Sequence, residues 1–221
     1  GFSPDDIKTI AVDDAVGLTV RYAGKEGSNL MPILLLGHMD VVEALDSDWE
    51  RSPFTLNEDE SYFYGRGTID NKYGVSMLAS TFVRLKKQGF VPNRDLYIVF
   101  SGDEETTMFT TEKLAYETAY LRDAEYALNS DAGGGSLNTN HEPVGYNVQA
   151  AEKTYATFEM TIHNPGGHSS IPRPDNAIYE LADALKAISQ YRFPINSSSV
   201  TREYFRQNSL KVEGETGSAM A

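Results

Sequence analysis

The sequence predicts an α/β fold in which a mostly parallel sheet is flanked by helices. Three short apolar runs, at residues 31–36, 96–100 and 126–128, are typical of buried strands. A segment with helical spacing, residues 73–88, lies between the first two runs. Strands that alternate with helices favour parallel pairing, and the carboxyl ends of parallel strands meet at one edge of a sheet.

The first half of the chain contains the better-defined elements. Residues 16–22 alternate weakly, as a strand does, and residues 24–29 have the composition of a turn before the first apolar run. In the helix expected at residues 73–88, basic side chains fill the last turn and Gly89 follows as a stop signal. Its apolar positions recur at helical spacing: Val75, Leu78, Ala79, Phe82 and Leu85.

The pattern changes near residue 150, where we place a domain boundary. Residues 1–151 are predicted to form one domain, and residues 152–221 part of a smaller α+β domain. Residues 154–162 alternate with period two, which is typical of a strand with one covered face. Asp175 is expected to cap a helix whose apolar stripe contains Ile178, Leu181, Ala184, Leu185 and Ile188.

Composition excludes several classes of partner and site. The net charge of −13, from 19 basic and 32 acidic residues, argues against nucleic acid and anionic membranes. The absence of cysteine excludes thiolate ligands, so a metal would be held by oxygen and imidazole. The longest apolar run is far shorter than the ~20 residues of a membrane-spanning helix. We expect a soluble protein and leave its compartment open between cytoplasm and periplasm or exterior.

Potential metal ligands follow each predicted strand. His38 comes after the first strand, Glu104 and Glu105 after the second, and Asp131 after the third. Asp70 follows a Gly-Arg-Gly bend and precedes the predicted helix, which makes it the best candidate for a carboxylate that bridges two ions. These side chains are expected to converge in one crevice.

Asp40 is placed to accept the second imidazole N–H of His38, which would fix the tautomer of that ligand. Each acid also has an ordinary structural explanation. Asp70 could cap a helix, Glu104 and Glu105 could lie in a solvated loop, and Asp131 could belong to a turn. Their joint occurrence at strand ends favours a site.

The order His38-x-Asp40, Gly65-Arg66-Gly67-x-x-Asp70-x-Lys72, Glu104-Glu105 and Asp131 resembles a known family. It is similar to the di-zinc metallopeptidases and amidohydrolases that include carboxypeptidase G, aminoacylase, carnosinase and the succinyl-diaminopimelate desuccinylases. The forms Gly-Thr-Ile-Asp-Asn-Lys and Gly-Gly-His-Ser-Ser are more similar to the carboxypeptidase S, or Gly-Xaa carboxypeptidase, branch.

The resemblance implies a zinc-exopeptidase-like catalytic domain, a lid domain that forms a homodimer, and two Zn²⁺ ions that Co²⁺ or Mn²⁺ could replace. It places His38, Asp70 and Asp131 around one ion, and Asp70 and Glu105 at the other. Glu104 would be the general base that takes a proton from the attacking water. His168 would reach across the dimer to stabilise an oxyanion. The substrate would be a peptide or an N-acyl-amino acid.

One departure from the family bears on activity. The family takes a further histidine ligand from a late segment, and no histidine follows His168 here. The second domain is also short of the ~100 residues typical of a domain, so we expect an incomplete part of a longer protein. The alternatives are a non-catalytic binding or assembly protein that keeps the fold, an inactive fragment, and an α/β domain whose acids are incidental.

Overall fold

The computed structural model describes residues 1–221, which divide into two compact units, Gly1–Val148 and Gln149–Ala221. The predicted boundary after residue 151 lies a few residues beyond this division. The assignment of the units to a catalytic domain and a lid domain stays a prediction.

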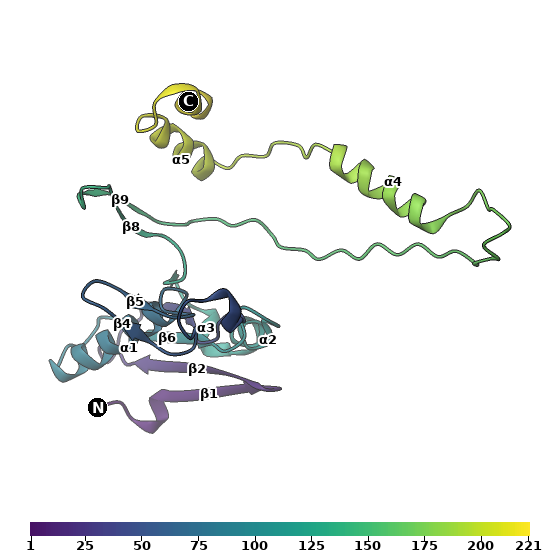
Figure 1. Cartoon of the computed structure of the whole chain (residues 1–221). Helices are drawn as coiled ribbons and strands as arrows, with labels where there is room; N and C mark the ends of the chain where they lie inside the picture. The colour runs from purple at the N-terminus through teal and green to yellow at the C-terminus, as the bar shows by residue number, and fades with distance from the viewer. The chain divides into compact units, whose positions relative to one another are not determined.

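The first unit is organised around a five-stranded sheet with the order β1-β2-β6-β3-β7. Figure 1 shows β1 and β2 side by side near the N-terminus. β3 pairs in parallel with β6 on one side and with β7 on the other. The β1–β2 and β2–β6 pairs are antiparallel. The predicted α/β fold is therefore confirmed, and its parallel part consists of the three strands expected from the apolar runs. The strands are β1 Ile7–Val12, β2 Ala15–Tyr22, β3 Ile33–His38, β6 Leu96–Ser101 and β7 Tyr126–Asn129.

Helix α1, Lys72–Lys87, covers one face of this sheet and begins one residue before the predicted start. Phe82 of this helix is 3% exposed and packs against Tyr22 and Ile98. Full burial of one such aromatic side chain stabilises the folded state by about 2–3 kcal/mol. Alternate residues of a strand point to opposite faces, so Tyr97 and Val99 of β6 pack on the other side.

The second face is covered by three short helical segments. Leu114 and Leu121 from these segments join Tyr97 and Val99 in a second apolar cluster. The fold therefore has three layers, with the sheet in the middle. The segments are α2 Phe109–Glu112, the π-helical turn η3 Lys113–Glu117 and α3 Ala119–Arg122.

Smaller elements complete the first unit. Two 3-10 turns, η1 Pro4–Asp6 and η2 Asp46–Asp48, lie in the connections. Two hairpins are formed by the pairs β4 Asn57–Glu58 with β5 Phe63–Tyr64, and β8 Gly134–Leu137 with β9 Pro143–Asn147. No helix of the structure combines the length and apolar character that a membrane crossing requires.

The second unit contains the helices α4 Ala177–Gln190, α5 Ser199–Ser209 and α6 Gly214–Met220. Two predictions made for it are wrong. Residues 154–162 form no strand, because a strand needs a hydrogen-bonded neighbour and this unit contains no other strand. Asn176 rather than Asp175 caps α4, since its side chain accepts the Ile178 N–H at 3.0 Å, while Asp175 pairs with Arg173 at 2.6 Å.

Candidate metal centre

The register of the parallel strands explains why distant residues meet at one edge of the sheet. His38 is the last residue of β3 and pairs with Ser101, the last residue of β6. On its other side β3 pairs Leu36 with Asn129, the last residue of β7. The loops that follow β6 and β7, which carry Glu104 and Asp131, therefore start beside the imidazole.

The His38 ring is buried and oriented by its own backbone neighbour. The residue is 2% exposed, and Nδ1 lies 3.1 Å from the carbonyl oxygen of Asp40. A carbonyl can only accept, so Nδ1 carries a proton and donates it. Nε2 then faces two carboxylates, with Oδ1 of Asp70 at 2.8 Å and Oδ1 of Asp131 at 3.5 Å.

The acidic surroundings control the protonation of His38. Burial opposes the charged form, but the hydrogen bond with Asp70 and the charges of Asp131 and Glu104 outweigh it, so the pKa of His38 is raised. A proton on Nε2 neutralises part of the surrounding negative charge. A divalent cation would perform the same electrostatic role more strongly at the same position.

The side chain of Asp40 acts differently from the prediction. The His38 imidazole donates to the backbone oxygen of Asp40, whereas the carboxylate of Asp40 lies 3.4 Å from Nδ1. That carboxylate accepts the backbone N–H of Glu104 at 3.0 Å and of Glu105 at 2.9 Å. Asp40 therefore links the loop after β3 to the loop after β6, and it sets the position of both glutamates.

The donor atoms form two groups around His38. The donors of His38, Asp70 and Glu105 lie within 4.8 Å of one another, and so do those of His38, Glu104 and Asp131. The grouping implied by the resemblance, with His38, Asp70 and Asp131 around one ion, stays a prediction; Asp70 and Asp131 both face Nε2 of His38. One imidazole with several carboxylates is a donor set that suits a borderline divalent cation such as zinc.

The two glutamates are harder to ionise than usual. Burial raises the pKa of Glu104; the charge of Asp131 adds to this effect, and His38 opposes it. Burial also raises the pKa of Glu105, with a further contribution from Asp70. Like charges held close together in a half-buried site produce this pattern, and a bound cation would relieve it.

Asp70 is presented by the sharp bend that the sequence predicted. Gly67 has a φ of +85°, and a Cβ at this position would come within 2.5 Å of Val41 Cγ1. Only glycine fits here without strain. Lys72 Nζ donates to the carbonyl oxygen of Met39, which ties the bend to the loop after β3. The Asp70 side chain stays 56% exposed and thus open to an incoming ion.

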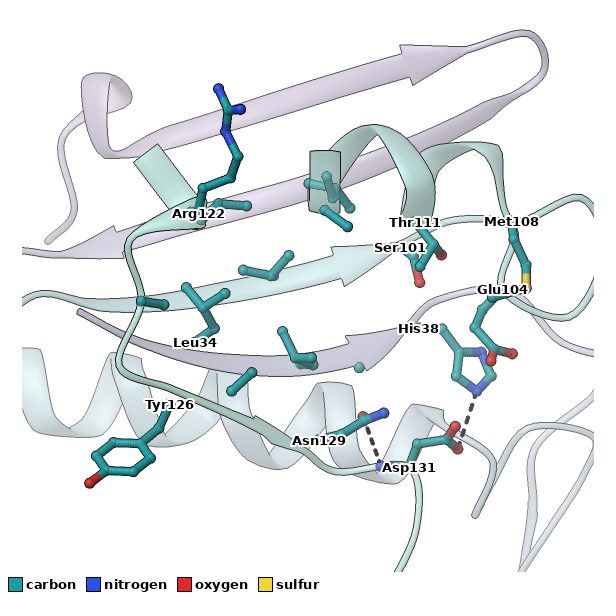
Figure 2. Close-up of a pocket in the computed structure, with 18 of the residues that line it drawn as sticks. Leu34, His38, Ser101, Glu104, Met108, Thr111, Arg122, Tyr126, Asn129 and Asp131 are labelled. Carbon is teal, nitrogen blue, oxygen red and sulfur yellow. Dashed lines mark hydrogen bonds and ion pairs between the residues drawn. The ribbon is translucent and has the colours of Figure 1, made fainter. Parts of the chain in front are cut away.

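A pocket of about 590 Å³ opens beside the centre. Figure 2 shows His38, Glu104 and Asp131 together at the carboxyl ends of the strands, with Tyr126 and Arg122 toward the opposite end. Much of the lining between these two ends is aliphatic: Leu34, Leu36, Val99, Leu114 and Leu121. A group bound in this pocket would have its polar end beside the imidazole and carboxylates.

Two residues near the centre were missed in the sequence analysis. Asn71 is fully buried and donates to Asp131 Oδ1 at 3.1 Å. Asp103 is 3% exposed and accepts the N–H groups of Phe109 at 2.7 Å and of Thr110 at 3.0 Å, which fixes the loop that carries Glu104. Burial would raise the pKa of Asp103, but its hydrogen bonds from Thr107 and Thr110 lower it. Asn71 follows Asp70 and Asp103 precedes Glu104 in the sequence, and this adjacency to predicted site residues was the signal that could have identified them.

His168, the remaining predicted site residue, belongs to the second unit. It is exposed, and its Nδ1 lies 2.8 Å from Ser170 Oγ and accepts the Ser170 N–H at 3.2 Å. This local turn holds the ring through Nδ1 and leaves Nε2 free to donate. Its role toward the first unit stays a prediction.

Residues 34–211 match the sequence profile of peptidase family M20/M25/M40. The chain is 34% identical over 170 residues to N-fatty-acyl-amino acid synthase/hydrolase PM20D1 of Xenopus tropicalis. This alignment covers 75% of this chain and 33% of the relative. The chain is 35% identical over 181 residues to the probable carboxypeptidase S-like 2 of Dictyostelium discoideum, with coverages of 77% and 34%. The chain thus spans about a third of the length of these curated relatives.

Solved structures share the fold. Human carnosine dipeptidase 1 superposes with a TM-score of 0.50 at 19% identity, over 59% of this chain and 32% of that one. The di-peptidase Dug1p from Saccharomyces cerevisiae also gives 0.50, at 22% identity, over 60% and 31%. At identities this low, the similarity shows a shared fold alone.

Proposed function

The chain belongs to peptidase family M20/M25/M40, and from this premise we propose that the protein is a metal-dependent hydrolase of a peptide or N-acyl-amino-acid amide bond. The observation that carries the proposal is the cluster around His38, where the end of β3 and three loops bring carboxylates and the imidazole into two groups whose donor atoms lie within 4.8 Å of one another. The family is metal-dependent, and this donor set fits such chemistry.

We propose that two zinc ions bind here, with Co²⁺ or Mn²⁺ as substitutes. His38, Asp70 and Asp131 would hold one ion, while Asp70 and Glu105 would contribute to the second. Zinc supplies Lewis acidity, which polarises a carbonyl and lowers the pKa of water. The Asp70 side chain is 56% exposed and contacts His38 through Oδ1, which supports its role as the shared ligand because Oδ2 is not used in that contact.

Glu104 would act as the general base. Its carboxylate lies in the same group of donors as His38 and Asp131, so it would lie beside a water held by a cation at His38. Glu104 would take the proton of the attacking water and deliver it to the leaving amine nitrogen. Asp40 would hold Glu104 in place, because its carboxylate accepts the backbone N–H of Glu104.

A panel assay on the purified protein tests this function. Dipeptides and N-acyl-amino acids would be incubated with added zinc, and free amino acids measured by mass spectrometry. Glu104→Gln should lower turnover by about 10²–10⁴-fold while zinc content is retained. Glu117→Gln, an exposed residue with the same change of charge, serves as the matched control. Unchanged turnover in Glu104→Gln would refute the role of Glu104 as general base. Binding of zinc and substrate by the wild type without hydrolysis would favour a non-catalytic protein.

We also propose that the second unit forms a homodimer in which His168 stabilises the oxyanion of the partner's reaction. The support is that Gly167-His168-Ser169-Ser170 lies within the matched residues 34–211 and that Nε2 of His168 is free to donate. The test mixes Glu104→Gln with His168→Ala. Each variant alone should be nearly inactive, but a 1:1 mixture should regain about a quarter of the activity, because half of the dimers would carry one intact site. No regain would place His168 outside a shared site.

A further inference from the structure

Asn71 occupies the N-cap position of α1 without capping the helix. An asparagine at this position usually accepts a backbone N–H from the first turn. Here the side chain makes no such hydrogen bond, although the residue is 0% exposed. A buried amide that gives up its usual partner has another structural task, and its contacts identify that task.

The amide of Asn71 is directed at the metal centre. Its Nδ2 donates to Oδ1 of Asp131 at 3.1 Å, and the same oxygen lies 3.5 Å from His38 Nε2. A carboxylate surrounded by other acids is repelled from the cluster unless a donor holds it there. An amide holds it without adding positive charge, whereas lysine or arginine would form an ion pair that competes with a cation.

The orientation of Asn71 is itself fixed. The single hydroxyl proton of Ser130 lies between two acceptors, Oδ1 of Asn71 at 3.2 Å and the carbonyl oxygen of Leu36 at 2.9 Å. An amide turned the other way would place its oxygen against the Asp131 carboxylate, where both groups can only accept. The Nδ2 group must therefore face Asp131.

Gly74 provides the space for this arrangement. A Cβ at position 74 would lie 2.2 Å from both Asn71 Oδ1 and Ser130 Oγ. Glycine inside a helix costs about 1 kcal/mol relative to alanine. The helix accepts this cost where the asparagine and the serine approach its backbone, which indicates that their placement is specified by the packing.

We infer that Asn71 is a positioning residue that fixes the Asp131 carboxylate for cation binding. The inference rests on the proposed function, since it takes Asp131 as a metal ligand. Asn71 would act through Asp131 alone, and Ser130 would support it from behind. Because Asn71 acts only through Asp131, its effect on zinc affinity should disappear when Asp131 is replaced. A residue needed only for folding would not show this dependence.

A double-mutant cycle on zinc affinity tests the inference. Zinc dissociation constants would be measured by competition with a chromophoric chelator for the wild type, Asn71→Leu, Asp131→Asn and the double variant. Asn71→Leu keeps the shape but loses the donor, and it should weaken binding about 10–100-fold. In the Asp131→Asn background the same change should cost less than about threefold, because its target is already gone.

Ser130→Ala keeps the test decisive if Asn71→Leu does not fold, as judged by circular dichroism in excess chelator. Ser130 is exposed, so its truncation should be tolerated. It should weaken zinc binding severalfold in the wild type and have no effect beside Asp131→Asn. Additive losses, or no loss in Asn71→Leu, would overturn this inference alone. Absence of zinc binding in the wild type, or full affinity in Asp131→Asn, would overturn the proposed metal centre together with it.

Discussion

Replacement of Asp40 by asparagine tests whether this residue organises the two glutamates. Its carboxylate accepts two backbone N–H groups, from Glu104 at 3.0 Å and Glu105 at 2.9 Å. A hydrogen bond to a charged group contributes about 1.5–3 kcal/mol. Asparagine keeps one acceptor but turns an NH₂ group toward the other N–H. We therefore expect the loop to lose about 2 kcal/mol of local stability.

Amide hydrogen exchange followed by NMR measures this loss directly. A loss of about 2 kcal/mol corresponds to about 30-fold faster exchange at the Glu104 and Glu105 amides of the metal-free protein. Asp48→Asn is the matched control, because Asp48 is exposed and its carboxylate bonds only to the Ser47 hydroxyl at 3.1 Å. Ile98, in the middle of β6, reports on global opening. Unchanged exchange at both glutamates, or equal acceleration at Ile98, would show that Asp40 does not hold this loop.

Three further predictions concern stability and pH. Gly74→Ala should lower the free energy of unfolding of the metal-free protein, measured in urea, by about 1–2 kcal/mol, because overpacking against Asn71 outweighs the gain in helix propensity. Replacement of the exposed Ser76 by alanine is the control and should change this free energy by less than about 0.5 kcal/mol. The raised pKa of Glu104 means that the folded state binds this proton more tightly than the unfolded state, so stability falls as pH rises above the ordinary value of 4.5. In chelator, Glu104→Gln should therefore be more stable than the wild type at pH 7 and similar to it at pH 4; equal curves at both values would contradict the assigned burial. The raised pKa of His38 implies that zinc displaces a proton near neutral pH, which calorimetry in two buffers of different ionisation enthalpy would detect, and a heat independent of buffer would argue against Nε2 as a ligand.

The parts of the fold that sequence patterns predicted are those with a strong local signal. Buried strands read as apolar runs, so β3, β6 and β7 were found within a few residues, and the 3.6-residue period located α1. Residues 154–162 show the period of a strand, but pairing depends on a neighbour that the local pattern does not specify. The N-cap of α4 is Asn176, one residue after the predicted Asp175, because Asp175 forms an ion pair with Arg173.

The candidate site was predictable to the level of which residues converge. His38, Asp70, Glu104, Glu105 and Asp131 come together as strand ends in a parallel sheet require. Which of these carboxylates share an ion stays a prediction, because it depends on side-chain directions in three loops. The contacts of Asp40 were likewise hidden, since its bonds to Glu104 and Glu105 span more than sixty residues of sequence.

The position of β3 between β6 and β7 has a consequence for metal exchange. A strand hydrogen-bonded along both edges can barely shift, so the imidazole at its end is a fixed point. The carboxylates approach from loops and can adjust by small rotations to ions of different radius. We expect such a cage to discriminate weakly among first-row divalent ions, so that cellular supply, rather than the shape of the cage, decides which ion the protein carries.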